Sequence, residues 1–496
     1  MRTLILTIIF TILFLPSISA QSENVHELGL KGIELTHDMQ YEKADKIFDE
    51  MIRLEPENAR GYFFKSACYY SSYTDENKHA ERFKDATNKA IDIARVMLQK
   101  NGDDPDAMFY LGGAYGKLGM YYLDNRKYIK AYWYGTKGIK YLKKVIEKDP
   151  DYYDAYLGLG IYNYSVSVLP KMIRSLSFLL RINEDREKGL DQIRLTSSKG
   201  IYAKDDAKIA LINIYLDYEN DFDAALQLLK GMVAKYPYNP INKESLARCY
   251  RKLKKHDLSV QTLKAALQAE SIVKFPFMHS RLYFDLGKTY SESNEYDQAV
   301  PAFENALKIS KSKIGKNASM KSWSLFYIGD CYEMTGSVDK ARECYLKIKK
   351  KDNKTAFKYA KGRIENPLTP VRIKFTRGKN CRLSGKYNQA YAIFNDLLKS
   401  ELNIKSLDKT FIAEFNYNLG AVEYYLKKYQ NAIQSLQEVL TINGIKEDWI
   451  KPWTHYYLGN CYREMNETEK AKKEYDIAYK FDDVAFLHKV EKVRRK

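Results

Sequence analysis

The chain has 496 residues and a formal net charge of +18, and 29% of its residues are charged. This length is too great for one compact hydrophobic core, and no linker rich in Pro, Gly or Ser divides the chain into globular units. Gly and Pro are sparse, at 25 and 12 residues, while Leu, Ile, Ala, Lys and Glu dominate. This composition favours helices throughout and excludes both a single globular domain and a strand-rich fold.

The first twenty residues have the pattern of a secretory signal peptide. Met1-Arg2 gives a short positive start, residues 3–15 are apolar, and 16–20 bring a Pro and small residues that end at Ala20. The apolar run is shorter than the roughly twenty residues that a membrane span needs. No Cys stands at the junction for a lipid anchor. We therefore expect cleavage after Ala20 and a periplasmic or extracellular mature chain.

From residue 25 onward the pattern is one of paired helices. The first pair begins near Val25, and Pro56 ends its second helix. The second pair begins at Ala59, and its second helix is expected over residues 80–99, followed by the C-cap signal Asn101-Gly102. The third pair, which ends at Pro150, is about fourteen residues longer than the others, so we expect longer helices there.

The fourth pair opens at Tyr156 and is then interrupted. Residues 165–182 replace the expected tight turn, and a second helix resumes after Asp185. The interruption places Leu169, Met172, Ile173, Leu176, Phe178, Leu179 and Leu180 beside Lys171, Arg174 and Arg181. Such a cationic amphipathic stretch has two interpretations: it fills the interior of the solenoid, or it lies on an anionic membrane surface. Residues for the possible membrane contact are Leu169, Lys171, Ile173, Arg174, Phe178 and Leu179.

Small and large residues recur in one frame over the second half of the chain. The clearest copy places Gly287 between Leu286 and Tyr290, with Tyr296, Ala299, Phe303 and Ala306 following. The glycine returns at Gly329, Gly378, Gly420 and Gly459, at intervals near forty residues. Residues 481–496 would then form a polar-faced capping helix after the last pair.

This frame resembles that of tetratricopeptide repeat proteins over nearly all of the mature chain. The resemblance implies an all-α, right-handed solenoid of about eleven helix pairs. We expect an N-terminal solenoid over 21–278, with the insertion at 165–182, and a C-terminal solenoid with its capping helix over 279–496. Within residues 105–235, the sequences at 168–171, 176–180 and 185–190 also resemble the eukaryotic inclusion-body-clearance and tetratricopeptide-repeat-39 family.

The six cysteines occupy core-facing positions of the pattern. Cys68, Cys249, Cys331 and Cys461 each precede the large residue of a first helix, and Cys381 takes the place of that residue. We expect them to be small buried residues, while a bridge between Cys331 and Cys344 stays an alternative. No Cys or His spacing indicates a metal site, and no phosphate-binding loop or nucleophile elbow occurs. The sequence predicts neither an enzyme nor a cofactor.

Binding of a partner protein or peptide is the function that the pattern favours. Resemblance to the family places ligand-facing residues at the second, fifth, ninth and twelfth slots of each repeat, on the concave wall. These slots hold Arg281, Phe284, Lys288, Trp323, Phe326, Asp330, Arg372, Phe375, Lys379, Arg382, Tyr417, Tyr424, Trp453, Tyr456, Asn460 and Arg463.

Aromatic and arginine side chains dominate interface hot spots, and the cations among these slots suit an acidic or C-terminal-carboxylate segment. The alternative is that these side chains only pack within the solenoid. The positive charge itself is spread over all repeats, as on an ordinary solvated surface. Export argues against nucleic acid as a partner.

Overall fold

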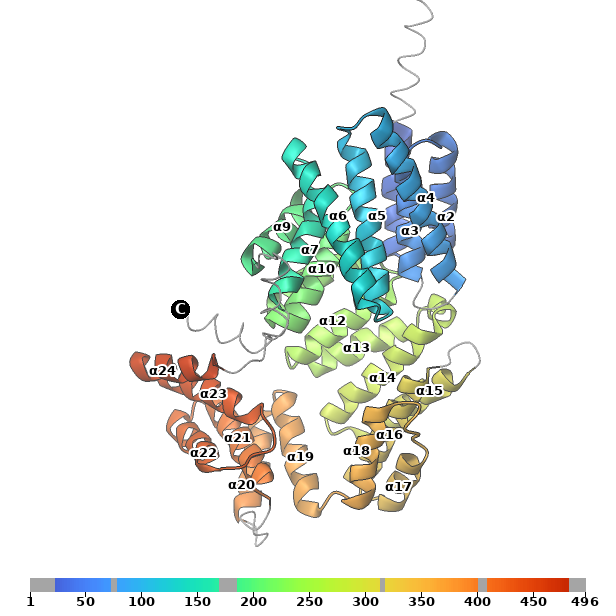
Figure 1. Ribbon diagram of the computed structural model, residues 1–496. Helices are drawn as coiled ribbons and strands as arrows, with labels where there is room; N and C mark the ends of the chain where they lie inside the picture. The colour runs from blue at the N-terminus through green and yellow to red at the C-terminus, as the bar shows by residue number, and fades with distance from the viewer. Residues whose placement is uncertain (1–22, 73–77, 169–184, 313–316, 400–407, 481–496) are drawn as a thin grey trace, which may run out of the picture. The chain divides into compact units, whose positions relative to one another are not determined.

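The computed structural model describes residues 23–72, 78–168, 185–312, 317–399 and 408–480, and the described residues form helices joined by short turns (Figure 1). The predicted signal peptide, most of the insertion at 165–182 and the predicted capping helix at 481–496 lie outside them. The chain divides into two compact units. Unit 1 holds residues up to Asn213 together with 234–239, and unit 2 holds 214–233 and the rest of the chain. The predicted division near residue 278 falls inside unit 2.

Unit 1 contains four antiparallel helix pairs and the helix that follows them. Residues 23–37 are helical and pair with the next helix. The others are α2 (Tyr41–Leu54), α3 (Ala59–Ser72), α4 (Lys78–Lys100), α5 (Pro105–Asp124), α6 (Tyr128–Lys148), α7 (Ala155–Ser167), α9 (Arg186–Lys199) and α10 (Lys204–Ile214). Helices α5 and α6 have 20 and 21 residues, which confirms the expectation of longer helices in the third pair.

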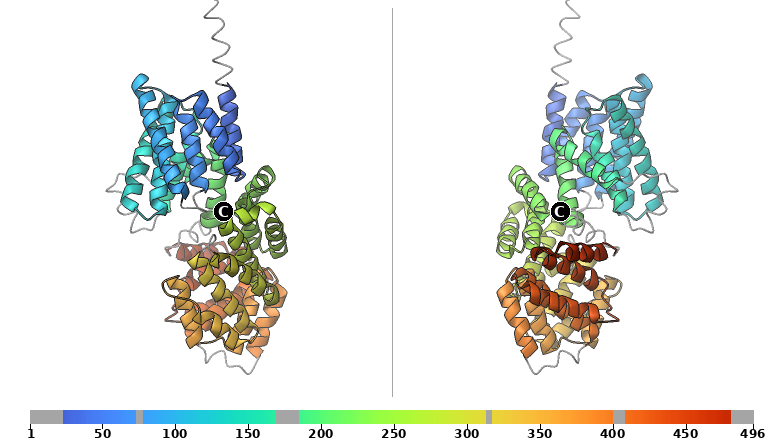
Figure 2. Two further views of the ribbon diagram at one scale, coloured as in Figure 1. Left: turned by 90° about the vertical axis from the view of Figure 1, so that its right-hand side faces the viewer. Right: turned by 90° about the vertical axis from the view of Figure 1, so that its left-hand side faces the viewer.

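Unit 2 continues the series of pairs (Figure 2). A π-helical turn η1 (Tyr215–Glu219) ends the first helix of the fifth pair, whose second helix is α11 (Phe222–Lys235). The next pairs are α12 (Pro240–Lys252) with α13 (His256–Leu267), α14 (Pro276–Glu292) with α15 (Tyr296–Lys311), and α16 (Ala318–Met334) with α17 (Val338–Leu346). The last three are α19 (Pro370–Leu383) with α20 (Tyr387–Lys399), α21 (Lys409–Tyr425) with α22 (Tyr429–Thr441), and α23 (Ile450–Glu464) with α24 (Thr468–Ala478). A short 3-10 helix, η2 (Glu270–Lys274), precedes α14.

One element of unit 2 has no counterpart in the sequence prediction. Helix α18 (Lys354–Glu365) stands alone between the pair α16–α17 and the pair α19–α20, and it packs against both helices of the former. Asn353 caps its N-terminus by accepting a hydrogen bond from the backbone N–H of Ala356 at 2.9 Å. This extra helix accounts for the wider interval between Gly329 and Gly378 than between the other repeat glycines.

The repeated glycine sets how closely the two helices of a pair approach. A methyl group added to Gly287 would lie 2.7 Å from a ring carbon of Phe303, on the second helix of the same pair. The same relation joins Gly329 to Tyr345, at 2.5 Å. Because any Cβ there would collide with a large buried ring, glycine lets each aromatic side chain fill the space between its two helices. The frame read from the sequence is therefore the packing register of the solenoid.

The six cysteines are buried, as expected, and all six are free thiols. Cys331 and Cys344 are therefore not joined to each other.

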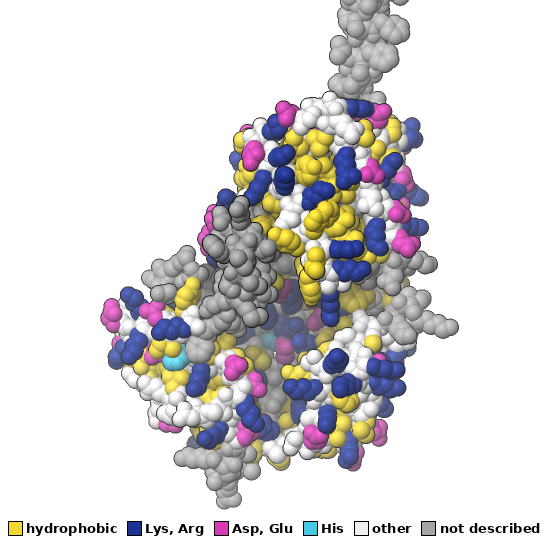
Figure 3. Space-filling view, viewed as in Figure 1, with side chains coloured by type: hydrophobic (Ala, Val, Ile, Leu, Met, Phe, Trp, Pro, Cys, Tyr) yellow, Lys and Arg dark blue, Asp and Glu magenta, His cyan; other side chains and the backbone are white. Residues whose placement is uncertain are grey.

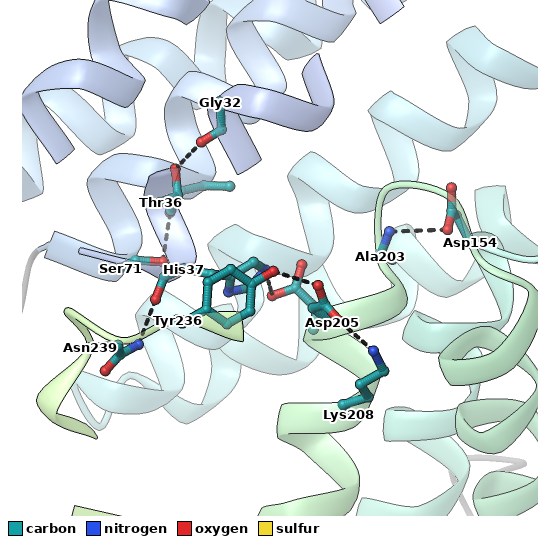
Figure 4. A network of polar contacts seen from close by, with 12 residues as sticks. Gly32, Thr36, His37, Ser71, Asp154, Ala203, Asp205, Lys208, Tyr236 and Asn239 are labelled. Carbon is teal, nitrogen blue, oxygen red and sulfur yellow. Dashed lines mark hydrogen bonds and ion pairs between the residues drawn. The ribbon is translucent and has the colours of Figure 1, made fainter. Parts of the chain in front are cut away.

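In unit 1, a later segment of the chain contacts the predicted ligand-facing slots of the first two repeats. His26 and Arg60 occupy the second slot of the first and second repeats, and both hydrogen-bond the Tyr202 hydroxyl, at 2.5 and 3.3 Å. The loop that carries Tyr202 is held by Asp154, whose carboxylate accepts hydrogen bonds from three consecutive backbone N–H groups at 201–203 (Figure 4). This face of unit 1 is thus occupied by the protein itself.

Residues 235–239 return to the same face of unit 1. The Asn239 side chain donates a 2.6 Å hydrogen bond to the carbonyl oxygen of His37, and the Tyr238 backbone N–H donates one to Asp38 at 2.9 Å. Tyr236 and Lys208 both donate to the buried carboxylate of Asp205, so that helix α10 is fixed to this segment (Figure 4).

Candidate partner-binding pocket

Unit 2 contains a pocket of about 390 Å³ on the inner side of its repeats. Its walls come chiefly from the first helices of four successive pairs: α14, α16, α19 and α21. The lining residues are Lys288, Ser291, Glu292, Tyr296, Tyr327, Asp330, Leu368, Arg372, Phe375, Thr376, Lys379, Asn380, Phe411 and Glu414. The four helices are first helices of their pairs, the helices that were assigned to the ligand-facing wall from the sequence.

Two polar contacts hold the far sides of the pocket together. The Asn380 side-chain amide on α19 donates a hydrogen bond to the carbonyl oxygen of Ser291 at the end of α14, at 3.1 Å, and another to the side-chain oxygen of Asn294, at 2.9 Å. Nearby, the Lys254 ammonium lies 3.7 Å from the centre of the Tyr425 ring and also contacts Tyr387. Helices far apart in the sequence are therefore joined, and the pocket has a fixed wall.

Most charged groups of the pocket are already paired within the protein. Lys379 binds Glu414 at 2.6 Å, and Arg372 binds Asp408. Asp330 pairs with Arg363; burial raises the pKa of its carboxyl group, although the guanidinium opposes this rise. The two charges within each pair neutralise each other, so these residues give the pocket little net charge.

Glu292 also has cationic partners within the protein. Its carboxylate faces the His256 ring at 3.3 Å and the Arg251 guanidinium at 3.6 Å. Burial alone would raise the pKa of Glu292, but the hydrogen bond with His256 and the positive charge of Arg251 outweigh burial and lower it. Glu292 is thus a carboxylate that the surrounding cations keep ionised.

Lys288 differs from the other cations of the pocket. It is half-buried, and no carboxylate of the described residues lies within ion-pairing distance of its ammonium group. The ammonium group makes a cation–π contact with the Tyr327 ring, whose centre is 5.9 Å away. Burial lowers the pKa of Lys288 and the positive charge of Arg251 lowers it further, while the negative charges of Glu292 and Asp285 oppose this fall. A carboxylate brought into the pocket would relieve both effects.

The apolar part of the pocket comes from aromatic rings on α16, α19 and α21. Phe375 and Phe411 meet edge to face, with ring centres 5.0 Å apart, and the Arg372 guanidinium lies 4.8 Å from the centre of the Phe411 ring. Tyr327 stacks on Phe303 at 5.3 Å. Phe375 and Phe411 are themselves buried, so the aromatic surface that the pocket exposes next to its cations is that of the half-buried Tyr327.

The sixteen predicted slot residues divide into three groups. The pocket brings together Lys288, Asp330, Arg372, Phe375 and Lys379. The side chains of Phe326, Arg382, Tyr417, Tyr456 and Asn460 are buried in the packing of unit 2. The remaining residues are partly exposed away from the pocket lining: Arg281, Phe284, Trp323, Tyr424, Trp453 and Arg463.

Contacts within the protein explain several of these placements. Arg382 donates a 2.8 Å hydrogen bond from Nε to the Asn418 side chain, and Asn460 accepts one from the Tyr475 hydroxyl at 2.8 Å. Trp323 packs against Phe326, with ring centres 5.8 Å apart. These side chains serve the solenoid, which is the alternative that the sequence left open for them.

Nine of the fourteen lining residues were missed by reasoning from the sequence, among them Glu414, Phe411, Asn380 and Glu292. Glu414 occupies the second slot of its repeat, so the pattern that predicted Arg372 could also have predicted it. Phe411 and Asn380 stand at other positions of their helices, and Glu292 is the last residue of α14. These residues line the pocket because of contacts between non-adjacent helices, and the spacing of the repeats does not predict such contacts.

Two further features of the described residues concern metals and membranes. They contain no cluster of three or more His, Cys, Asp or Glu side chains able to hold a metal ion. Among the helices that the structure describes, none is both long and apolar enough to cross a bilayer.

Comparison with known protein families finds the same repeat that the helix packing shows. Family profiles described as tetratricopeptide repeats match residues 279–348, 413–445 and 454–480. These three segments of the chain are tetratricopeptide repeats. The matches at 279–348 and 454–480 carry repeat glycines that contact a ring of the paired helix, and part of the pocket lining lies in the first of these two segments.

A curated TPR repeat-containing protein of Methanocaldococcus jannaschii is 23% identical to this chain over 315 residues, which cover 53% of this chain. The match spans about half of that relative, at 54% of its length.

Two solved structures are similar at low TM-scores. A tetratricopeptide repeat protein from Parabacteroides merdae has a TM-score of 0.26 and 16% identity, with 59% of this chain and 99% of that chain covered. The TPR domain of P58(IPK) has a TM-score of 0.21 and 14% identity, with 90% of this chain and 99% of that chain covered. The narrower resemblance of residues 105–235 to the inclusion-body-clearance family stays a prediction.

Proposed function

We propose that this protein is an exported, non-catalytic scaffold that binds an acidic segment of a partner protein in the pocket of unit 2. The observation that carries the proposal is Lys288, an unpaired and half-buried ammonium group in a pocket whose other charges are matched. A partner carboxylate supplies the missing counter-ion, and the half-buried ring of Tyr327 contacts the apolar part of the same segment.

The location of the pocket also supports this assignment. Tetratricopeptide repeats serve widely as scaffolds for protein interaction, and the pocket lies on first helices. In unit 1, by contrast, inner slots such as His26 and Arg60 are occupied by the protein's own Tyr202. Unit 2 is therefore the unit with room for a partner.

The direct experiment is affinity capture with residues 21–496 immobilised, against an extract of the native envelope fraction at low and moderate salt. Lys288→Glu reverses the charge of the pocket, Lys288→Arg keeps it, and Lys361→Glu is the matched control. Lys361 is 64% exposed on α18 and pairs only with Glu365, one turn away. We expect one acidic protein to be retained by the wild type, Lys288→Arg and Lys361→Glu, and to be lost with Lys288→Glu.

Equal retention by the two glutamate variants would overturn the pocket assignment. Retention of many acidic proteins only at low salt would show that the diffuse net charge binds, since exposed charges are screened within about 8 Å at physiological salt.

Export is tested separately. The full chain is produced in a secreting host, and the N-terminus of the recovered protein is determined by mass spectrometry. We expect the mature chain to begin at Gln21. An intact Met1 in the cell-associated fraction contradicts this expectation.

A further inference from the structure

The end of the third helix pair presents an unusual surface in unit 1. Six large apolar or aromatic side chains are exposed where α5 ends and α6 begins: Met120, Leu123, Tyr128, Ile129, Tyr132 and Trp133. We call this group the α5–α6 tip. Ile129 is 87% exposed and Trp133 is 54% exposed. Exposed apolar side chains that are scattered singly need no explanation, but six in one place mark a contact surface.

Helix lengths explain why no other described helix of unit 1 covers the tip. Helix α7 has 13 residues and α6 has 21, and in α6 buried residues begin only at Gly138. Because α7 runs back along α6 from the α6 C-terminus, it ends before it reaches the first turns of α6. Those turns touch α5 through Gly119, at which an added methyl would lie 3.1 Å from the backbone of Gly135. The opposite side of these turns stays uncovered.

From the α5–α6 turn along most of α6, all charged side chains are positive. Residues 125–146 contain no Asp or Glu, and their seven basic residues are Arg126, Lys127, Lys130, Lys137, Lys140, Lys143 and Lys144. Within the part of the chain that the structure describes, none of the seven makes an ion pair. Figure 3 shows yellow apolar and dark blue basic side chains intermixed over the region of α5 and α6.

The basic side chains stay close to the aromatic ones. The Lys137 ammonium lies 4.9 Å from the centre of the Trp133 ring and 4.4 Å from that of Tyr115, and Lys130 lies 5.4 Å from Tyr122. Asp124, the acid nearest to the tip in sequence, accepts a hydrogen bond from the Tyr70 hydroxyl at 2.6 Å. The tip therefore combines protruding apolar groups with cations that have no counter-ion.

We propose that the α5–α6 tip docks on an anionic lipid surface. Trp and Tyr rings prefer the boundary between headgroups and acyl chains, where Ile129 enters beside Trp133. Lysines extend their apolar stems along such a boundary and place their ammonium groups at lipid phosphates. A protein interface is the poorer match, because Lys is depleted there. The residues of this surface are different from those of the pocket of unit 2 and of the amphipathic stretch at 165–182.

The test is co-sedimentation of residues 21–496 with vesicles made of equal parts phosphatidylglycerol and phosphatidylcholine, and with pure phosphatidylcholine vesicles. We expect binding to the anionic vesicles alone, and a loss of about tenfold or more in Ile129→Glu and in the pair Lys140→Glu with Lys144→Glu. The matched control is Leu346→Glu, because Leu346 is an apolar residue of unit 2 that is 63% exposed. Trp133 emission should shift to shorter wavelength with anionic vesicles, and Trp133→Phe should remove that shift.

Three results overturn the proposal. Binding that Leu346→Glu weakens as much as Ile129→Glu shows no specific surface. Binding that is lost in Leu179→Glu but kept in Ile129→Glu assigns the contact to the stretch at 165–182. An absence of lipid binding, with a dimer in sedimentation velocity that Trp133→Glu dissociates, makes the tip an interface between two copies. Should a glutamate variant unfold by circular dichroism, Ile129→Ser replaces it, since a residue so exposed tolerates serine.

Discussion

The side-chain amide of Asn380 donates a hydrogen bond to the main-chain carbonyl oxygen of Ser291, at 3.1 Å. The bond joins α19 to the end of α14, and these two helices form facing parts of the pocket wall. A second bond from the same amide, to Asn294 at 2.9 Å, fixes the turn that follows α14. One side chain therefore ties together two repeats that are not neighbours in the sequence.

We expect Asn380→Ala to destabilise unit 2 by about 1–2 kcal/mol, because the side-chain hydrogen bonds that join α19 to the end of α14 are lost. Partner binding should weaken as well, since the pocket loses its fixed wall. Chemical denaturation measures the first effect, and the capture experiment measures the second. Thr376→Ala, on the same helix and in the same pocket, is the control and should leave stability within about 0.5 kcal/mol.

Gly287→Ala should cost about 1–3 kcal/mol, since the new methyl would lie 2.7 Å from a buried ring carbon of Phe303 and the helix pair must move apart. Gly362→Ala on α18 is the matched control. A methyl there meets no other atom within 4 Å, so alanine should be neutral or should stabilise the helix by up to about 1 kcal/mol. Urea denaturation of both variants checks the contrast. Equal effects would mean that the glycine frame does not set the helix spacing.

The sequence predicted the parts of this fold that depend on short-range spacing. Phe303 follows Gly287, and Tyr345 follows Gly329, at one constant interval, so the helix pairs and their register could be found from local periodicity. Longer helices in the third pair followed from its length in the same way. Helix α18 was missed because no glycine and aromatic pair marks it.

The candidate site was only partly accessible from the sequence. Slot positions gave Lys288 and Lys379, because the pattern fixes which side of a first helix faces inward. The slot positions did not predict that Arg382 would hydrogen-bond the Asn418 side chain. They also did not predict that Tyr202 would contact the predicted ligand-facing slots of unit 1. Both results depend on contacts between distant segments, and a repeat pattern carries no information on those.

Thiol reactivity provides a test of cysteine burial. Burial raises the pKa of Cys68, Cys331 and Cys461 to about 12, and that of Cys249 to about 11. Because the thiolate is the reactive form, these thiols should react with iodoacetamide at pH 8 at least about a hundredfold more slowly than an exposed cysteine. Mass spectrometry of the native protein should find them unmodified, and all six should react after denaturation.

The reference for this rate is Ser198→Cys, which adds an exposed thiol near the end of α9. Rapid alkylation of the native cysteines, at the rate of the added one, would contradict the buried positions.

Asp205 should make the stability of unit 1 depend on pH. Its side chain is 8% exposed, and its carboxylate accepts hydrogen bonds from Lys208 and Lys235, each at 2.7 Å, and from the Tyr236 hydroxyl. Burial alone would raise the pKa of Asp205, but these three donors outweigh burial and hold the pKa below its usual range. The folded state therefore binds this proton less readily than the unfolded state does.

The sign of the effect follows from that difference. The stabilisation by Asp205 is fully present above the unfolded pKa, near about 3.9, and is lost as the pH falls toward the lower folded pKa. We expect Asp205→Asn to cost about 2–4 kcal/mol at pH 7, because two cations and a buried hydroxyl lose their charged partner. The gap between variant and wild type should narrow below about pH 4.

The neighbouring carboxylate provides the control. Asp206 is 53% exposed and lies 3.7 Å from the His37 ring, so Asp206→Asn should change stability by at most about 0.5 kcal/mol at pH 7. Thermal unfolding of the wild type and both variants at pH 7, 5 and 3.5 provides the comparison. A loss in Asp205→Asn that stays constant across this range would show that packing, and not the ionised carboxylate, makes the contribution.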